Sequence, residues 1–269
     1  MDNLKITYSM KSESIGSGRP IVLVPGGLTG WISWEPHSKI LSNDYRVTRV
    51  QLLAVDLGLE DKPLPKGYSF KLESDALLNA INKEGILQAD FVAWSYGAEV
   101  TLNFALDNPD KIRTLTLIEP PAIWVLRSRG PLSKEMVEDQ KKLQLLGPGD
   151  ISEEQLVWFS HFAGFVPSDK NPRELPQWPV WVKYRQSLRT GDAVFLENDY
   201  IKKVRSFKKP VLLFKGVGSP KFLTEIIDIL GQEFPDATVK ELPGAHALHI
   251  VSINQFIDIL IKFLKKENN

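Results

Sequence analysis

Apolar residues in this chain gather in short continuous runs that alternate with stretches of helical spacing. The continuous runs predict buried strands at PIVLV (20–24), YRVTRVQLL (45–53), DFVAW (90–94), TLTLI (114–118), VLLFKG (211–216) and TVKEL (238–242). Apolar positions recur at helical spacing over residues 71–84, 96–108, 220–232 and 252–265. Strands that alternate with helices through short links are typical of an α/β fold, whose mostly parallel central sheet is covered by helices on both faces.

Residues 122–206 interrupt this alternation. They contain no clear buried strand, but helical patterns cover 133–145, 152–163 and 178–189. We therefore predict one α/β core, formed by residues 1–121 and 207–269, and a helical cap (122–206) inserted between two of its strands.

The predicted cap is rich in aromatic residues. Most of them are expected to form the cap's own core, because large aromatic side chains are usually buried. An insertion at this point lies over the carboxyl edge of the sheet, where open α/β sheets bind ligands, so some of these residues should line a cavity. The candidates for substrate binding are Trp124, Trp158, Phe162 and Trp181.

Composition and charge exclude several classes of function. The 33 basic and 33 acidic side chains balance, so neither nucleic acid nor a membrane is an expected partner. The absence of cysteine excludes disulfides, thiolate metal sites and a cysteine nucleophile, and favours a reducing compartment. The N-terminal segment lacks the features of a signal peptide, and no apolar run is long enough to span a membrane. We expect a cytoplasmic monomer or homodimer that acts on a small molecule.

Ser95 lies in DFVAWSYGAEV (90–100), where a strand pattern changes to a helix pattern. Small residues, Ala93 and Gly97, flank the serine at a spacing of two. This arrangement is typical of a nucleophile elbow, in which a serine on a tight strand-to-helix turn is raised above the sheet. The spacing alone is a weak signal, since an ordinary serine can end a strand. The strand before it and the helix after it are what an elbow requires.

A nucleophilic serine needs backbone donors for the oxyanion that forms when it attacks a carbonyl group. One candidate donor is the N–H of Tyr96, the residue after the serine. The other is the N–H of Gly27, in the loop that follows the first predicted strand in VLVPGGLTGW. Without Ser95, two glycines after a strand would indicate only a turn.

Four histidines are candidates for a general base: His37, His161, His246 and His249. His246 follows the last predicted strand in the loop LPGAHALHI, which places it at the same edge of the sheet as Ser95. His249 is expected to begin the last helix or to point away, and His161 belongs to the cap. A lone loop histidine is usually only solvated, but its position at a strand end makes His246 the candidate base.

Five segments carry a resemblance to a known family: VLVPGGLTGW, AWSYGA, LTLIEPP, PVLLFKG and LPGAHALH. In this order they resemble segments of α/β-hydrolase-fold proteins, and the resemblance extends from about residue 5 to the end of the chain. It implies that residues 122–206 hold the position of the variable cap. It also implies an acid between Ser95 and His246, because the family's chain order is Ser, acid, His.

The acid departs from the commonest arrangement in this family, an Asp after the strand equivalent to VLLFKG. That loop here reads GVGSP (216–220) and holds no carboxylate. Some members, including one group of haloalkane dehalogenases, place the acid after the preceding strand, which corresponds to Glu119. Glu119 could instead cap a helix or pair with an arginine such as Arg127. The site would then be a Ser–His dyad assisted by water or Ser219. Asp56 is another acid near this edge, but it precedes the elbow in the chain, so it is interpreted as structural or as part of a loop surface.

The residues and the resemblance together predict a serine hydrolase that uses Ser95, His246 and Glu119 and needs no metal or organic cofactor. The resembled dehalogenases and epoxide hydrolases use an aspartate at the elbow, so their chemistries are not expected. The aromatic cap favours a medium-sized, mostly apolar ester; a lactone, a thioester or a carbon–carbon bond are alternatives. Two other classes stay open: a small-molecule receptor with slow or no turnover, and a cofactor-independent lyase or oxygenase that uses His246.

Overall fold

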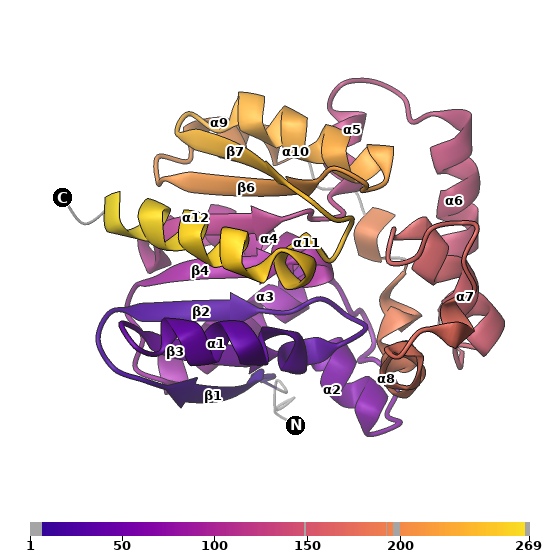
Figure 1. Ribbon diagram of the computed structural model, residues 1–269, viewed down its shortest axis with the longest axis horizontal. Helices are drawn as coiled ribbons and strands as arrows, with labels where there is room; N and C mark the ends of the chain where they lie inside the picture. Colours follow the sequence, from indigo (N-terminus) through magenta and orange to yellow (C-terminus); the bar gives the residue numbers. More distant parts are fainter. Residues whose placement is uncertain (1–6, 148, 192, 196–199, 267–269) are drawn as a thin grey trace, which may run out of the picture.

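A seven-stranded sheet runs through the computed structural model, which describes residues 7–147, 149–191, 193–195 and 200–266 (Figure 1). The strands are β1 (Lys11–Ile15), β2 (Pro20–Val24), β3 (Arg46–Gln51), β4 (Ala89–Trp94), β5 (Ile112–Ile118), β6 (Val211–Gly216) and β7 (Ala237–Leu242). Their order is β1-β3-β2-β4-β5-β6-β7, and all neighbours are parallel except β1 and β3. The predicted α/β fold with a mostly parallel sheet is confirmed.

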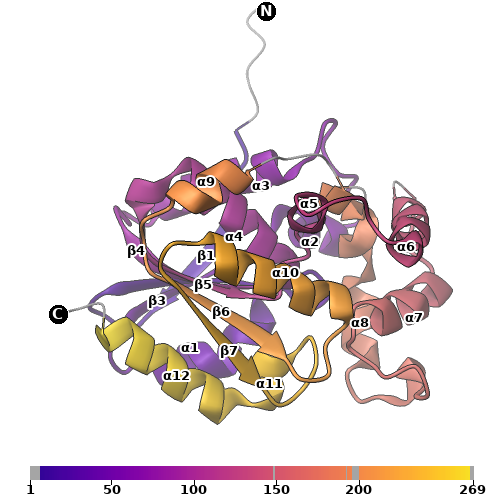
Figure 2. The same ribbon diagram turned by 90° about the horizontal axis from the view of Figure 1, so that it is seen from above.

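Helices cover both faces of the sheet (Figure 2). One face carries α1 (Glu35–Leu41), α11 (Leu248–Val251) and α12 (Ile253–Lys266). The other carries α3 (Phe70–Lys83), α4 (Ser95–Asp107) and α10 (Lys221–Glu233). Short 3-10 helices link these elements at η1 (Gly30–Trp34) and η2 (Pro109–Lys111). No helix in the described ranges combines the length and the apolar character that crossing a membrane requires.

The central strand β4 is covered on both faces of the sheet. All six of its residues are buried. Phe91 and Ala93 belong to the apolar core on the side of α3 and α4, whereas Val92 and Trp94 belong to the core on the side of α1 and α12. Because both faces are covered, the strand appears in the sequence as a continuous apolar run rather than an alternating one.

Three helices, α6 (Lys134–Gln144), α7 (Glu153–Phe162) and α8 (Trp178–Tyr184), lie beyond the carboxyl ends of the strands (Figures 1 and 2). They occupy the three helical stretches predicted in 122–206, although the last continues as the 3-10 helix η4 (Arg185–Thr190). Two further short turns are η3 (Pro172–Glu174) and η5 (Ala193–Phe195). Helices α5 (Ile123–Arg127) and α9 (Ile201–Ser206) pack against α10 of the core instead. The domain boundaries at 122 and 206 stay a prediction.

Some elements were not predicted, because their formation depends on tertiary contacts. The strand β1 is polar (KSESI) and lies at the edge of the sheet, antiparallel to β3. The predicted strand 45–53 is shorter in the structure, where β3 covers Arg46–Gln51 and α2 (Leu53–Leu59) begins at Leu53. The buried carboxylate of Glu73 accepts hydrogen bonds from the amides of Leu53 and Ala54 at 3.0 and 2.9 Å, and so stabilises the first turn of α2. Residues 1–6 of the N-terminal segment lie outside the described residues.

Candidate active site

Ser95 occupies the tight turn between β4 and α4. Its backbone φ is +55°, in the left-handed region that costs a non-glycine residue about 1–2 kcal/mol. Gly97 permits the turn, because a Cβ atom at this position would lie 2.1 Å from the carbonyl oxygen of Pro25. The turn therefore has the close backbone approach and the strained serine that define an elbow.

The structure brings Ser95, His246 and Glu119 into one hydrogen-bonded chain. Oγ of Ser95 lies 2.7 Å from Nε2 of His246, and Nδ1 of the same ring lies 2.7 Å from Oε2 of Glu119. A carboxylate can only accept, so Nδ1 carries the ring hydrogen and Nε2 accepts the hydrogen of the Ser95 hydroxyl. In this tautomer the imidazole can take the serine proton, and the carboxylate can stabilise the imidazolium that results.

Glu119 is held in place from two sides. It follows β5 directly, has a backbone φ of +44° and is fully buried. One carboxylate oxygen faces His246, and the other accepts a hydrogen bond from the amide of Gly216 at the end of β6, at 2.7 Å. Both oxygens are therefore hydrogen-bonded, which a buried carboxylate requires.

His246 is fixed to the strand that carries the serine. The indole N–H of Trp94, the last residue of β4, donates to the carbonyl oxygen of His246 at 2.8 Å. Phe165 of the cap packs edge-on against the imidazole at 5.2 Å between ring centroids. Only 2% of His246 is exposed, so its orientation is set by packing as well as by hydrogen bonds.

The two predicted oxyanion donors lie beside the elbow. A Cβ atom on Gly26 would lie 3.2 Å from Cβ of Ser95, so the loop after β2 passes directly alongside the serine. Gly27 and Tyr96 both line the cavity described below. The amide of Tyr96 belongs to the first turn of α4, where N–H groups have no carbonyl partner within the helix. Donation by these two amides to a substrate stays a prediction.

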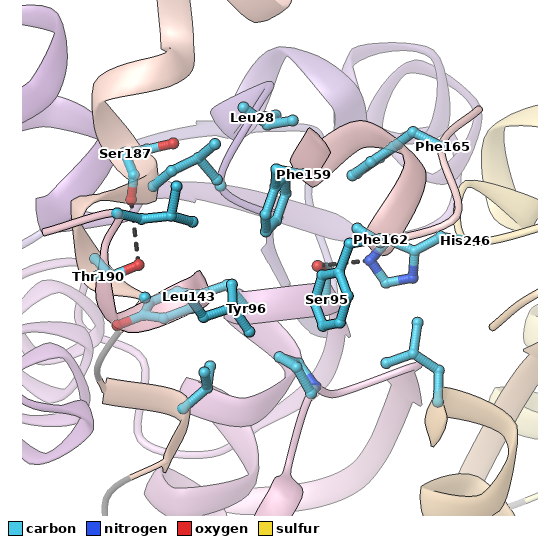
Figure 3. Close-up of a pocket in the computed structure, with 18 of the residues that line it drawn as sticks. Leu28, Ser95, Tyr96, Leu143, Phe159, Phe162, Phe165, Ser187, Thr190 and His246 are labelled. Atoms are coloured by element: carbon cyan, nitrogen blue, oxygen red, sulfur yellow. Dashed lines mark hydrogen bonds between the residues drawn. The ribbon is translucent and has the colours of Figure 1, made fainter. Parts of the chain in front are cut away.

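A mostly apolar cavity of about 70 Å³ lies between these residues and the cap (Figure 3). Ser95 and His246 stand at one end of it, and Ser187 and Thr190 of η4 lie across the cavity from them. The apolar lining of the cavity includes Leu28, Leu143, Phe159, Phe162, Phe165 and Phe222. An apolar cavity with a few polar groups is the usual form of a small-molecule site.

The structure places the four aromatic residues predicted for substrate binding in different surroundings. Phe162 lines the cavity, whereas Trp124, Trp158 and Trp181 do not. Trp158 lines a wider groove of about 1150 Å³ and stacks on Phe162, with 5.2 Å between the ring centroids. Trp181 packs against Phe165, with 5.6 Å between the ring centroids. These two tryptophans therefore support the phenylalanines that form the wall. Trp124 is buried in α5, with its ring edge-on to Tyr200.

Several residues that line the cavity are not among those predicted from the sequence to bind the substrate. Phe159 lies three residues before Phe162, on the same face of α7, so the helical spacing of the cap would have indicated it. Phe222 belongs to α10, whereas Ser187 and Thr190 belong to the 3-10 helix η4. Nothing in the local sequence distinguishes these three residues from residues that do not line the cavity. Their position results from how the cap lies on the core.

The remaining histidines lie outside the hydrogen-bonded chain of Ser95, His246 and Glu119. His37 and His249 are fully buried, and their rings lie 5.4 Å apart beside Trp34. Burial lowers the pKa of His37 to about 4 and that of His249 well below its usual value, so both rings are neutral at pH 7. His161 stays in the cap on α7, with Nδ1 3.2 Å from the carbonyl oxygen of Val166.

The acid that precedes the elbow in the chain also lies apart from the site. Asp56 is on α2, where it pairs with Lys11 of β1 at 2.7 Å on the molecular surface. This ion pair joins the edge strand to α2 and has no contact with the Ser95–His246–Glu119 chain.

Comparison with known proteins defines the family. Residues 21–255 match the alpha/beta hydrolase family, so the chain belongs to it. The chain is 23% identical over 251 residues to the putative carbamate hydrolase RutD of Klebsiella pneumoniae, with 90% of both chains covered. It is 34% identical over 175 residues to a haloalkane dehalogenase of Agrobacterium fabrum, which covers 61% of this chain and 53% of that protein. The predicted membership of the α/β-hydrolase superfamily is confirmed.

A solved structure shares the fold. The crystal structure of a hydrolase from Pseudomonas aeruginosa superposes with a TM-score of 0.75 at 18% identity, covering 95% of this chain and 94% of that chain. At this identity the likeness concerns the overall fold alone.

Proposed function

We propose that this α/β hydrolase cleaves carboxylic esters through an acyl-enzyme on Ser95. The observation that carries the proposal is the hydrogen-bonded chain at the strained turn, with 2.7 Å from Ser95 to His246 and 2.7 Å from His246 to Glu119. Nucleophile, base and orienting acid are thus within hydrogen-bond distance of one another.

In the first half-reaction, Oγ of Ser95 attacks the acyl carbon while Nε2 of His246 takes its proton. The amides of Gly27 and Tyr96 donate to the oxyanion, and the N-terminus of α4 favours the negative charge that develops there. The imidazolium then gives its proton to the departing alcohol. The bond between the acyl carbon and the alcohol oxygen breaks, and the acyl group remains on Ser95.

In the second half-reaction, a water molecule attacks the acyl-enzyme. His246 takes a proton from the water, the bond to Oγ of Ser95 breaks, and the serine recovers its hydrogen as the acid leaves. Glu119 stays ionised in both steps and holds the hydrogen on Nδ1, so Nε2 always faces the reacting atoms.

The shape of the cavity favours a small, mostly apolar acyl group. The cavity of about 70 Å³ is narrow for the medium-sized substrate that the aromatic cap had suggested. The phenylalanine walls offer no charged partner to a substrate, so an uncharged ester is favoured over an ionised one. Short p-nitrophenyl esters are therefore the first substrates to test.

The proposal is tested with a fluorophosphonate probe and p-nitrophenyl butyrate. The expected result is covalent labelling at Ser95, identified by peptide mass spectrometry, together with many turnovers per protein molecule. Ser95→Ala should lose both, and Ser219→Ala should keep both, because Glu119 rather than Ser219 contacts His246. Labelling followed by a single slow turnover would favour a receptor. Absence of labelling in the folded protein would contradict the proposed nucleophile.

A further inference from the structure

The end of the cavity opposite Ser95 carries a group of hydroxyls in otherwise apolar surroundings. Figure 3 shows Ser187 and Thr190 across the cavity from Ser95 and His246, with Tyr96 extending toward them. The hydroxyl of Tyr96 lies 2.8 Å from that of Tyr68, which does not line the cavity. The two ends of the cavity are therefore polar, and phenylalanine and leucine side chains separate them.

Most of the hydroxyl hydrogens at this end are already used within the protein. Thr190 donates to the carbonyl oxygen of Ser187 at 3.2 Å, and Tyr68 donates to the carboxylate of Glu73 at 2.6 Å. Because the hydrogen of Tyr68 is directed to Glu73, the Tyr96 hydroxyl is the donor in the bond between the two tyrosines. Burial holds the pKa of both tyrosines well above the usual range, so both keep their hydrogens.

The Ser187 hydroxyl is the exception. Only 3% of Ser187 is exposed, and its Oγ has no hydrogen-bond partner among the residues that the structure describes. Most buried hydroxyls in proteins are hydrogen-bonded, because leaving one unpaired costs free energy. The hydroxyl also lies close to the loop after β2, since a Cβ atom on Gly27 would be 3.3 Å from Ser187 Oγ.

The partner that fits this hydroxyl is uncharged. Apart from His246 at the catalytic end, the described residues that line the cavity include no histidine, lysine or arginine. An anionic group at the far end would therefore be buried without a countercharge, which is very unfavourable. A ketone, ether or hydroxyl oxygen on the substrate could accept from Ser187 without this cost.

We propose that Ser187 is a specificity-determining residue whose hydroxyl donates a hydrogen bond to an uncharged oxygen at the end of the acyl chain remote from the ester. This inference rests on the proposed function and adds the substrate class: short esters of keto, hydroxy or ether acids rather than of plain alkanoic acids. The serine favours the oxygen-bearing chain because its hydroxyl then gains a hydrogen-bond partner, whereas with a plain chain it stays unpaired as in the free protein.

The test compares matched pairs of p-nitrophenyl esters: 4-oxopentanoate with pentanoate, 5-oxohexanoate with hexanoate, and 6-oxoheptanoate with heptanoate. The wild-type protein should prefer the keto ester by about tenfold in kcat/KM in at least one pair. Ser187→Ala should bring that ratio to about one, mainly by slowing the keto ester, while the alkanoate changes by less than about twofold. Ser187→Cys keeps the shape of the side chain but donates only weakly, so it should behave like Ser187→Ala.

The matched control is Ser160→Ala. Ser160 is a second buried serine of the cap, but its hydroxyl donates to the carbonyl oxygen of Val157 at 2.7 Å, and it does not line the cavity. Its removal should leave the keto preference unchanged. A loss of preference in this variant as well would mean that general damage to the cap, rather than the Ser187 hydroxyl, causes the effect, and would overturn the proposal.

A binding assay separates this inference from the proposed chemistry. Isothermal titration of the same esters to Ser95→Ala measures affinity without turnover, and the keto preference should disappear in the Ser95→Ala/Ser187→Ala double variant. Keto preference in binding without ester turnover by the parent would support Ser187 and contradict the esterase. Equal affinity and equal kcat/KM within every pair, or a preference that survives Ser187→Ala, would overturn the role of Ser187 and leave ester hydrolysis intact.

Discussion

The carboxylate of Glu119 accepts a hydrogen bond from the amide of Gly216, so an acid that follows one strand is fixed by the end of the next. The loop after Gly216 is where the commonest members of the family carry their acid, and in this chain it holds no carboxylate. The strand that lacks the acid thus supplies a backbone donor for it. The two strand ends together hold the carboxylate opposite His246 at 2.7 Å.

Replacing Glu119 by Gln should lower kcat at least about 100-fold while the protein stays folded. An amide cannot hold the hydrogen on Nδ1 in the same way, and it cannot stabilise the imidazolium. Steady-state kinetics with p-nitrophenyl butyrate, together with circular dichroism, measures both effects. Asp228→Asn is the control, because Asp228 pairs with Lys215 on the surface, and it should change kcat by less than about twofold. Full activity in Glu119→Gln would remove Glu119 from the mechanism.

Ser95→Gly should be more stable than Ser95→Ala, by about 0.5–1 kcal/mol in the free energy of unfolding. Both variants lose the hydrogen bond to His246, but only glycine adopts the φ of +55° without strain. Urea denaturation of the two variants gives the difference directly. Equal stabilities would show that the turn stores no backbone strain.

Gly97→Ala should destabilise the protein by about 2 kcal/mol or more, because the new Cβ atom forces the loop at Pro25 away from the elbow. Activity should also fall, since the displaced loop carries Gly27. Gly149→Ala is the control, because a Cβ atom there meets nothing within 4 Å. Urea denaturation and ester kinetics of both variants check this, and unchanged stability of Gly97→Ala would contradict the close approach at the turn.

Phe162→Ala should extend the range of accepted acyl chains. Phe162 stacks on Phe222 at 5.1 Å and borders both the cavity and the wider groove, so its removal joins the two spaces. The ratio of kcat/KM for p-nitrophenyl octanoate to that for the acetate should rise about tenfold. Phe263→Ala truncates a partly buried phenylalanine of α12, away from the cavity, and should leave the ratio unchanged. A ratio that does not rise in Phe162→Ala would show that this ring does not limit chain length.

The protein should be less stable in mild acid than at pH 7, because the buried ring of His37 disfavours protonation. Its folded pKa of about 4 lies below the ordinary value of 6.5, because burial disfavours the charged ring. Between these two pH values the unfolded chain binds a proton that the folded protein does not, so the free energy of unfolding decreases as the pH falls. The contribution of His37 is about 3 kcal/mol at most, complete above pH 6.5 and lost toward pH 4.

The measurement is urea denaturation of the parent and of His37→Gln at several pH values from 7 to 4. Glutamine is neutral throughout and can still donate to the carbonyl oxygen of His249, which lies 3.0 Å from His37 Nε2. The slope of stability against pH should be smaller in the variant, although part of it remains because the pKa of His249 is lowered too. An identical slope in both proteins would contradict a neutral buried His37.

The predictable parts of the fold are the elements whose burial produces a continuous run of apolar residues in the sequence. The strand before Ser95 is apolar throughout because it is covered on both faces, so its extent and its end could be read directly. The edge strand β1 is polar and forms only because β3 lies beside it. Helix α2 begins where the carboxylate of Glu73, about 20 residues further along the chain, accepts hydrogen bonds from two backbone amides. The local sequence does not indicate this start, because it depends on that distant side chain.

The candidate site divides in the same way. Ser95, Glu119 and His246 each come directly after a predicted strand or in the loop that follows one, so parallel topology alone brings them to one edge. The cavity wall depends on how the cap lies on the core, so the sequence alone cannot distinguish Phe159, which lines the cavity, from Trp158, which stacks on Phe162 outside it. Ser187 could not be predicted, because an unpaired hydroxyl is a property of its surroundings rather than of its neighbours in sequence.

The hydrogen bonds that link Ser95, His246 and Glu119 are made by residues that follow β4, β5 and β7, while the predicted cap (122–206) contributes Phe159, Phe162 and the hydroxyl of Ser187 to the cavity lining. The two ends of the predicted cap are therefore suitable points at which to exchange it for the cap of a relative. Chimaeras that graft the corresponding segment of a relative between them should inherit a new choice of substrate and keep the original reaction.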